Sequence, residues 1–396
     1  MNTAHAKEQT VRVIHVGKYF PPDRGGMETY LRDLIFSLLE RGIRSVGLVH
    51  HSSTSFTSTA EQYRQGENAI EITRAGSWFR LLFTPVSPMF PWLLRRLIKM
   101  HRPRLLHLHL PNPSAFSVLL LPSARRLPWV IHWQSDVLTP KSSWALRLGY
   151  AFYKPFESAL LKRASRIIVT SVNYLDTSRT LAPFRDTCRV IPLGVNDRFS
   201  DNRGPDATWL PDAPLKVLAI GRLTHYKGFD TLLRAMTQLS HVRLDLVGDG
   251  EQLTNLKKLG QSLGIMDRVR FYGEVGDEEK DHLLQACDCL CLPSNDRAES
   301  FGLVLVEAMS AGKACVITDV PGSGMTWVVD ANRTGLIVPP DNSDALGVAL
   351  SKLESDRDLL KELGTRGRKK YEKELTINAS ASAVLALYDD IEAANP

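Results

Sequence analysis

Two consecutive series of short apolar runs, each run followed by a helical pattern, constrain the fold of this chain more than any other feature. The runs are rich in Val, Ile and Leu and are too short for helices, so they are typical of strands buried on both faces of a parallel sheet. The first series comprises Val11–Gly17, Ser45–His50, Leu105–Leu110, Trp129–Trp133, Arg166–Thr170 and Arg189–Pro192. The second comprises Lys216–Ile220, Arg243–Val247, Arg268–Tyr272, Cys289–Pro293, Ala314–Thr318 and Leu336–Val338. Two such series predict two doubly wound α/β domains.

A linker separates the two series. The segment Ser200–Pro214 is rich in Pro, Gly and Asp, as linkers are. We therefore expect a first domain at residues 10–203, a second at 204–375, and a terminal segment at 376–396. Open α/β sheets bind ligands beyond the carboxyl ends of their strands. Functional residues should therefore follow strands and line a cleft where the two domains face each other.

Composition excludes several other classes of protein. Hydrophobic residues make up 43% and charged residues 23%, which excludes disordered, collagen-like and coiled-coil chains. No stretch reaches the roughly 18 uninterrupted apolar residues of a membrane-spanning helix. Residues 1–10 contain no apolar segment of a signal peptide. Five cysteines form no disulfide framework, so we expect a reduced, cytoplasmic protein.

Basic residues are concentrated in the first half of the chain. Residues 1–205 contain 28 Lys and Arg against 14 Asp and Glu, whereas residues 206–396 contain 21 against 29. From Ile72 to Ser135 there are eight Arg, one Lys and no acid. This difference suggests that the two domains bind different ligands.

Aromatic and basic residues mix within this acid-free region, between positions 77 and 99. The apolar members are Trp78, Phe79, Phe83, Phe90 and Trp92, and the bases include Arg95 and Arg96. This pattern suits shallow insertion at an anionic membrane surface. A core helix with solvated arginines explains it equally well, so both interpretations stay open.

Two pairs of residues in the predicted loops are suited to a phosphate. Gly25 and Gly26 precede a helix, where glycines let backbone amides approach an anion, although an ordinary turn is the alternative. Arg222 and Lys227 follow the strand Lys216–Ile220 and lie at the start of the next helix. Because a helix N-terminus is already electropositive, an added Lys lowers stability unless an anion binds there. A diphosphate is the expected ligand.

Two glutamates follow the strand Cys289–Pro293. Glu299 precedes a helix, and Glu307 lies about five residues inside it, a rise of ~7.5 Å. Two carboxylates at different positions along the helix axis are suited to accept hydrogen bonds from the hydroxyls of two sugar rings. Glu307 stands in an otherwise apolar segment, where a carboxylate is rare unless it is paired. The alternatives are a helix N-terminal charge for Glu299 and an exposed position for Glu307.

Histidine and cysteine residues carry weaker indications. His132 lies at the carboxyl end of the strand Trp129–Trp133, and both a structural and a functional role are open. Cys287, Cys289 and Cys291 lack the loop spacing and the fourth ligand of a zinc site. We therefore predict no metal site.

The motifs together resemble those of the retaining glycosyltransferases of the large nucleotide-sugar family with the GT-B fold, glycosyltransferase family 4. The matching pieces, in family order and over nearly the whole chain, are Gly25-Gly26-x-Glu28, His132-Trp-Gln-Ser-Asp136, Ile191-Pro-Leu-Gly194-Val-Asn196, Gly221-Arg222-Leu-x-x-x-Lys227-Gly228, Val247-Gly-Asp-Gly-Glu251 and Glu299-x7-Glu307. The Arg/Lys pair combined with the two-glutamate motif is the specific part. The tract from His132 to Asp136 is most similar to mannosyl- and rhamnosyltransferases of bacterial surface polysaccharide assembly.

The resemblance implies roles around the donor diphosphate and ribose. Arg222 and Lys227 would neutralise the diphosphate, helped by the amides of Gly25 and Gly26. Glu307 would hold the nucleotide ribose. The fold would be GT-B: two Rossmann-like domains facing across a cleft.

It also implies roles around the donor sugar and base. Glu299 would hold sugar hydroxyls beside the amides of Phe301, Gly302 and Leu303, and His132 would lie near the anomeric carbon. The loop Gly273-Glu274-Val275 would meet the base. The segment Ile377–Glu392 would be a helix that crosses back to the first domain.

The function implied is transfer of a hexose from a nucleotide diphosphate sugar, with retention, to a lipid-linked or polysaccharide acceptor in bacterial surface glycan synthesis, such as lipopolysaccharide. GDP-mannose is the favoured donor and a UDP-sugar is possible, with no cofactor and no nucleic-acid partner. Two cations and helix N-termini would replace a divalent metal, since the Asp-x-Asp at 356–358 lies in a charged helical stretch. The protein would act in the cytoplasm, peripherally at the inner face of the cell membrane. The alternatives are a GT-B epimerase and an inactive sugar-nucleotide-binding partner of a transferase complex.

Overall fold

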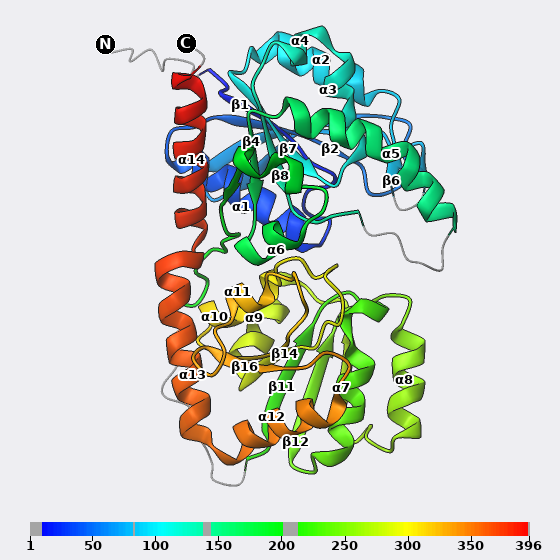
Figure 1. Ribbon diagram of the computed structural model, residues 1–396, viewed down its shortest axis with the longest axis vertical. Helices are drawn as coiled ribbons and strands as arrows, with labels where there is room; N and C mark the ends of the chain where they lie inside the picture. Colours follow the sequence, from blue (N-terminus) through cyan, green and yellow to red (C-terminus); the bar gives the residue numbers. More distant parts are fainter. Residues whose placement is uncertain (1–9, 82–83, 138–143, 201–212, 395–396) are drawn as a thin grey trace. The chain divides into compact units, whose positions relative to one another are not determined.

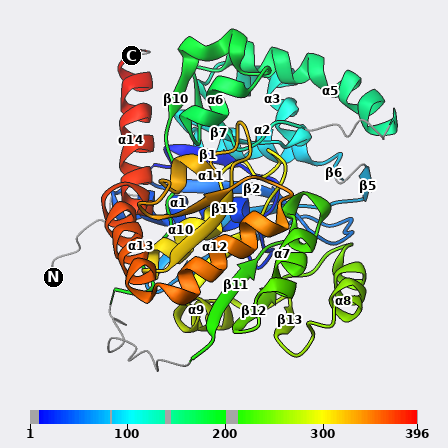
Figure 2. The same ribbon diagram turned by 60° about the horizontal axis from the view of Figure 1, so that its bottom comes forward.

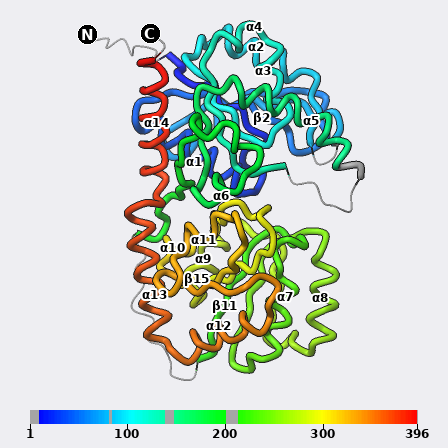
Figure 3. The backbone as a smooth tube through the Cα atoms, viewed as in Figure 1, coloured from blue at the N-terminus to red at the C-terminus, as the bar shows by residue number. Residues whose placement is uncertain are grey.

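The chain forms two units, which a computed structural model describes for residues 10–81, 84–137, 144–200 and 213–394 (Figures 1 and 3). Unit 1 comprises Met1–Thr170, Ser178–Ile191 and Ser380–Pro396, and unit 2 comprises Ser171–Thr177 and Pro192–Ala379. The N-terminal part of unit 1 therefore reaches residue 191, short of the expected 203, and the backbone of Val195 pairs with that of Thr376 within unit 2. Residues 201–212 of the expected linker lie outside the described residues.

Unit 1 is built on an eight-stranded sheet with the order β10-β9-β8-β7-β1-β2-β4-β3. The strands are β1 (Val13–Val16), β2 (Ser45–His50), β3 (Thr59–Gln65), β4 (Asn68–Ala75), β7 (Leu105–Leu110), β8 (Trp129–Trp133), β9 (Arg166–Val169) and β10 (Cys188–Val190). The helices are α1 (Gly26–Glu40), α2 (Phe90–His101), α3 (Ser117–Leu120), α4 (Pro122–Arg125), α5 (Trp144–Arg163) and most of α14 (Ile377–Ala393), with the 3-10 turns η1 (Pro113–Phe116) and η2 (Ala182–Thr187). A separate two-stranded sheet, β5 (Phe79–Leu81) with β6 (Thr84–Val86), comes between β4 and α2 in the sequence.

Unit 2 is built on a six-stranded parallel sheet with the order β13-β12-β11-β14-β15-β16. The strands are β11 (Leu215–Ile220), β12 (Val242–Val247), β13 (Val269–Gly273), β14 (Cys289–Leu292), β15 (Ala314–Thr318) and β16 (Gly335–Val338). The helices are α6 (Val172–Thr177), α7 (Phe229–Ala235), α8 (Leu253–Ser262), α9 (Asp277–Ala286), α10 (Leu303–Ser310), α11 (Met325–Val328), α12 (Ser343–Ser355) and α13 (Arg357–Lys370), with η3 (His225–Lys227), η4 (Met236–Gln238) and η5 (Tyr371–Leu375). Figure 2 shows α7 and α12 side by side, and their leucines share one core with the sheet.

The strand order of each sheet reverses once, which marks where a ligand is expected. In unit 1 the chain places β2 on one side of β1 and β7 on the other. In unit 2 it places β12 on one side of β11 and β14 on the other. Open parallel sheets bind ligands at such a reversal, beyond the carboxyl ends of the two central strands. The fold therefore predicts ligand-binding residues in the loops after β1 and β7 in unit 1 and after β11 and β14 in unit 2.

The twelve strands that the apolar runs predict are all present in the described residues, and a hairpin adds two more to the sheet of unit 1. Strand β3 pairs antiparallel with β4, and Gly66 supplies the turn with φ +58°. The apolar runs do not predict this hairpin, because β3 is almost fully exposed and polar residues interrupt the apolar ones in β4. The sheet of unit 1 is therefore parallel except at this edge, and not wholly parallel as the runs predicted.

The C-terminal helix α14 belongs mainly to unit 1, as the sequence predicted for residues 377–392 (Figures 1 and 3). The guanidinium of Arg12, just before β1, donates to Asp389 at 2.5 Å and to Glu392 at 2.7 Å. The hydroxyls of Tyr30 on α1 and Ser380 on α14 lie 2.8 Å apart in a fully buried position. The last helix is therefore part of the first unit's structure and not an appendage to the second.

Four buried histidines lie together on the central strands of unit 1. His15 on β1, His107 and His109 on β7, and His132 on β8 are all at most 6% exposed. The rings of His107 and His132 stack at 5.4 Å with 8° between their planes, and those of His107 and His109 stack at 4.4 Å. Burial lowers the pKa of each imidazole, so all four are neutral at neutral pH.

All five cysteines are free and buried. Burial raises the pKa of the Cys188 thiol to about 11 and that of Cys287 to about 12. Within the described ranges, no helix combines the length and apolarity needed to span a membrane.

We predict that acid destabilises unit 1 through its histidines. Burial lowers the pKa of His15 and His132 to about 3, against 6.5 for the free side chain. Between these values the unfolded chain binds more protons than the folded chain, so stability that is fully present above pH 6.5 is lost as the pH falls toward 3. The melting temperature, measured against pH, should fall steeply below about pH 6.5.

A pair of variants isolates this contribution. The variant His132→Asn removes one histidine whose pKa is lowered by burial. As the pH falls, its melting temperature should therefore decrease less steeply than that of the wild type. The variant His282→Asn changes an exposed histidine of unit 2 and should keep the wild-type slope. Equal slopes in all three proteins would show that the buried histidines do not govern acid stability.

Candidate functional site

The loops after β11 and β14 meet where the sheet of unit 2 reverses its strand order. Gly228, which caps α7 with φ +64°, lies against the carbonyl of Pro293, and a Cβ there would collide with that oxygen. The amide of Asn295 donates to the carbonyl of Tyr226 at 2.8 Å. These backbone contacts fix the end of one loop against the start of the other. They bring Lys227 and Glu299, which are 72 residues apart in sequence, into contact.

Lys227 and Glu299 form a nearly buried ion pair at this reversal point. The Lys227 ammonium donates to the Glu299 carboxylate, and their side chains are only 10% and 12% exposed. Burial is the largest influence on the pKa of Lys227 and lowers it, but the Glu299 carboxylate and Tyr226 together raise that pKa above its ordinary value. Lys227 therefore stays charged, and the sequence prediction that it lies at a strand end and helix start is confirmed.

Arg222 adds a second positive charge beside Lys227. It follows β11 directly after Gly221 and is exposed, and its charge acts on Lys227. The Lys227 side chain runs over Gly221, where an added Cβ would lie 3.0 Å from its ammonium. Glycine at this position therefore leaves space for the lysine to reach the strand end.

Glycines of the neighbouring loop let two backbone segments pack directly. A Cβ at Gly248 would collide with the carbonyl of Gly221, and one at Gly250 would collide with that of Leu223. The amide of Leu223 donates to the carbonyl of Asp249 at 2.9 Å. The Val247-Gly-Asp-Gly-Glu251 tract is thus explained by close packing against the Arg222 loop.

Glu299 lies just before the N-terminus of α10. Gly302 caps this helix with φ +78°, and α10 begins at Leu303. Phe301 is 2% exposed, and its ring packs 6.1 Å from that of Trp327. The first amides of α10 form an electropositive helix end in the residues that follow Glu299. The sequence placed Glu299 before this helix correctly.

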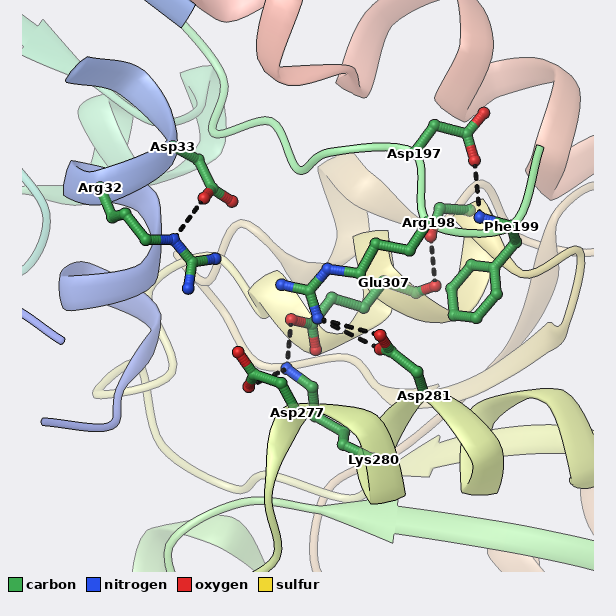
Figure 4. A network of polar contacts seen from close by, with 10 residues as sticks. Arg32, Asp33, Asp197, Arg198, Phe199, Asp277, Lys280, Asp281 and Glu307 are labelled. Carbon is green, nitrogen blue, oxygen red and sulfur yellow. Dashed lines mark hydrogen bonds and ion pairs between the residues drawn. The ribbon is translucent and has the colours of Figure 1, made fainter. Parts of the chain in front are cut away.

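Glu307 is paired with Lys280, as Figure 4 shows. Its carboxylate accepts from the Lys280 ammonium at 2.8 Å, and the two side chains are 14% and 16% exposed. Next to this pair, Arg198 donates to Asp281 at 3.1 Å. The expectation that a carboxylate in this apolar segment must be paired is confirmed. The partner, Lys280, was not found from the sequence.

The loop after β13 leads directly into the helix that carries Lys280. Gly273 ends the strand with φ +72°, Glu274 is exposed, and Val275 is half-buried. Helix α9 begins at Asp277. The residues predicted to meet a base therefore lie within one turn of the helix that contacts Glu307.

In unit 1, Gly25 and Gly26 stand at the start of α1, which follows β1. Gly25 is the N-cap of the helix, and a Cβ there would collide with the Glu28 carboxylate, which folds back over it. Asn112, after β7, is buried and donates to the carbonyl of Gly17 at 2.8 Å. The two loops at the strand-order reversal of unit 1 are therefore tied together.

His132 has no exposed surface. It stacks among the other histidines, and its ring packs edge-on against Tyr30 at 5.1 Å. The imidazole is enclosed in this conformation, and neither of its ring nitrogens has a hydrogen-bond partner among the described residues, so the structural and functional roles both stay open. Gln134, which follows β8 directly, is 3% exposed, and neither atom of its amide has a partner among the described residues. In the sequence, Gln134 stands out only as part of the tract from His132 to Asp136.

One group of three histidines in the described part of the chain brings possible metal ligands together. Nitrogens of His15, His107 and His109 lie within 4.8 Å of one another. The Nδ1 of His15 and the Nε2 of His109 lie 3.1 Å apart, a hydrogen-bond distance, so these two nitrogens partner each other. Asp356 of the Asp-x-Asp instead caps α13, accepting from the amide of Leu359 at 2.9 Å.

Unit 2 thus gathers two cations, two carboxylates and a helix N-terminus along the carboxyl edge of its sheet. Cations and helix amides stabilise phosphate charge, and carboxylates accept hydrogen bonds from sugar hydroxyls. This arrangement suits an anionic ligand that also carries sugar rings.

Two family models match the chain. Residues 25–194 match the model described as "Glycosyl transferase 4-like domain". Residues 205–370 match the model "Glycosyl transferases group 1". The first match covers most of unit 1 and the second covers most of unit 2.

Several curated relatives are similar over much of their length. The O-antigen chain mannosyltransferase C of Escherichia coli is 27% identical over 96% of this chain and 98% of its own. The D-rhamnosyltransferase WbpZ of Pseudomonas aeruginosa is 30% identical over 68% of each chain. A GDP-mannose-dependent alpha-(1-6)-phosphatidylinositol monomannoside mannosyltransferase of Mycobacterium tuberculosis is 29% identical over 90% of this chain and 92% of its own.

Solved structures agree on the fold. A sucrose-phosphate synthase from Thermosynechococcus elongatus superposes with a TM-score of 0.78 at 23% identity, covering 97% of this chain and 100% of that one. The doubly wound α/β units, the family models and these relatives together show that the chain belongs to the group 1 glycosyltransferases, family 4, with the GT-B fold.

Proposed function

We propose that this protein is a retaining glycosyltransferase that moves a hexose, with mannose favoured, from a nucleotide diphosphate sugar to a lipid-linked or polysaccharide acceptor in bacterial surface glycan synthesis. One observation carries the proposal: Lys227 and Glu299 meet beside Arg222 at the strand-order reversal of unit 2. GDP-mannose is the favoured donor, because mannosyltransferases, one of them GDP-mannose-dependent, are among the relatives. A UDP-sugar is the second choice.

The proposed roles follow the positions of the side chains in unit 2. Arg222 and Lys227 would bind the donor diphosphate, and Glu299 and the amides of Phe301, Gly302 and Leu303 would bind the sugar. Glu307 would accept from the ribose hydroxyls, with Lys280 orienting its carboxylate. The loop with Glu274 and Val275 would meet the base.

The chemistry requires charge stabilisation at the leaving group. Glycosyl transfer passes through an oxocarbenium-like state while negative charge builds on the departing diphosphate. Cations held in place before the reaction lower this barrier. The Lys227 ammonium is held by Glu299 and stays protonated, so it meets that requirement. In unit 1, the amides of Gly25 and Gly26 would add donors for phosphate.

We also propose that the protein acts peripherally at the inner face of the cell membrane. Exposed Trp92, Arg95, Arg96 and Lys99 on α2 support this. Phe90, however, is fully buried in unit 1, so it belongs to the core and not to a membrane contact. Phe83 lies outside the described residues.

An assay of donor turnover with and without acceptor tests the function. Purified protein with GDP-mannose should release GDP and label lipid only when a bacterial lipid extract is present. Turnover of the donor to another sugar nucleotide without lipid would indicate an epimerase instead. Binding of GDP without any turnover would indicate an inactive binding partner. Replacing GDP-mannose with UDP-sugars identifies the donor.

Replacing Lys227 with Ala should abolish most of the activity, because it removes a charge aimed at the diphosphate. Turnover should fall by about 10²-fold or more, and the thermal shift produced by GDP should disappear. The variant Lys369→Ala, at an exposed position of unit 2, is the matched control and should behave as wild type. Normal GDP binding by a folded Lys227→Ala protein would remove the diphosphate assignment.

Turnover should be unchanged by EDTA. The proposal assigns charge compensation to Arg222 and Lys227, and Asp356 of the Asp-x-Asp is engaged as a helix cap. The measurement is the rate of GDP release before and after chelation, with added Mg²⁺ or Mn²⁺ as a further arm. Loss of turnover with EDTA that either ion restores would show that a metal shares this role.

A further inference from the structure

Helix α5 of unit 1 carries an exposed apolar stripe. Leu148, Phe152 and Phe156 are 51%, 71% and 50% exposed. They recur at every fourth residue, so they lie on one face of the helix. Figures 1 and 2 show α5 along the outside of unit 1. Single exposed apolar residues are common, but three on consecutive turns form a patch that is typical of a contact surface.

Other side chains of α5 fix the helix to the unit. Glu157, Leu160 and Leu161 are buried. The ring of Phe116 on η1 packs 4.8 Å from that of Tyr153. Because these residues already anchor the helix, Leu148 and Phe152 are not needed to hold α5 in place, whereas Phe156 also stacks on Phe116 at 5.8 Å.

Basic residues border the stripe and acids do not. Exposed Arg147, Lys154, Lys162 and Arg163 lie on α5, and its single acid, Glu157, is buried and accepts from the Tyr150 hydroxyl at 3.1 Å. Between Ile72 and Arg163 the only acids in the sequence are Asp136 and Glu157.

The basic surface continues from α5 onto the neighbouring helices. Arg163 donates to the carbonyl of Arg125 at the end of α4, so α5 and α4 are adjacent. Helix α4 in turn packs against α2. The exposed bases on these two helices and just after α4 are Arg95, Arg96, Lys99, Arg125 and Arg126.

We infer that α5 lies in the headgroup layer of an anionic bilayer, with Leu148, Phe152 and Phe156 inserted and the bases of α5, α4 and α2 over the anionic lipid. An apolar face next to exposed bases is the pattern of a helix that lies in the interface plane. Each Lys or Arg near such a surface adds favourable electrostatic free energy that salt screens. The inference rests on the membrane association proposed above and identifies α5 as the inserting element.

Charge complementarity favours the bilayer over a second copy of this chain. A second copy of this chain would bring the same basic surface against itself, and like charges would oppose the contact. An anionic lipid surface instead offers opposite charge beside an apolar layer. Self-association is therefore an outcome that the test must include.

Vesicle flotation of the full chain tests the inference. Wild-type protein should float with vesicles of phosphatidylethanolamine containing phosphatidylglycerol at low salt, and not with phosphatidylcholine alone. The variant Leu148→Ser/Phe152→Ser keeps Phe156, which contacts Phe116. Its affinity for the vesicles should fall by about tenfold or more. The variant Arg95→Glu/Arg96→Glu should bind more weakly and show a weaker salt dependence. Val348→Ser, which changes a 68% exposed apolar residue of unit 2, should bind as wild type.

Three results would overturn the inference. These are wild-type protein that stays unbound on anionic vesicles at low salt, a Leu148→Ser/Phe152→Ser variant that floats as wild type, and sedimentation showing a wild-type dimer that this variant dissociates. The thermal shift with GDP is measured on every variant. A normal shift together with lost flotation separates failure of membrane binding from failure of the nucleotide-site proposal.

Discussion

The ion pair between Lys227 and Glu299 is the interaction on which the rest of the unit 2 site depends. Two charges that are nearly removed from water are tolerated only when each satisfies the other. They meet because Gly228 lets the loop after β11 pack against Pro293 at the end of β14. Loss of either charge would leave the other buried without its partner, which typically costs about 3–5 kcal/mol. The geometry of the two loops and the charge of the site are therefore set by one contact.

Local sequence patterns predicted the strands and the order of the loop residues, because burial of parallel strands imposes continuous apolar runs. Glu299 before α10 and Glu307 inside it were predicted from their distance along the chain alone. The pairing of Glu307 with Lys280 was not, because that contact joins α10 to α9 and nothing in the local pattern of α9 distinguishes Lys280 from other surface lysines.

Other features depend on long-range packing and could not be predicted from one stretch of sequence. His132 stands at a strand end in the sequence, yet it is buried because Tyr30 of α1 and the histidines of β7 surround it. The edge strand β3 contains no apolar run, because its side chains face solvent and only its backbone pairs with β4. In both cases the deciding partner comes from a different part of the chain.

The burial of all five cysteines has a consequence for the chemical behaviour of the protein. The thiolate is the form that reacts with alkylating agents and oxidants, and burial raises the pKa of these thiols. Modification then requires local opening of the sheet that holds each residue. Cys188 lies in the edge strand β10 of unit 1, whereas Cys289 and Cys315 lie in central strands of unit 2. The alkylation rate of each native thiol therefore reports how often the sheet that holds it opens, and the two sheets can be followed independently.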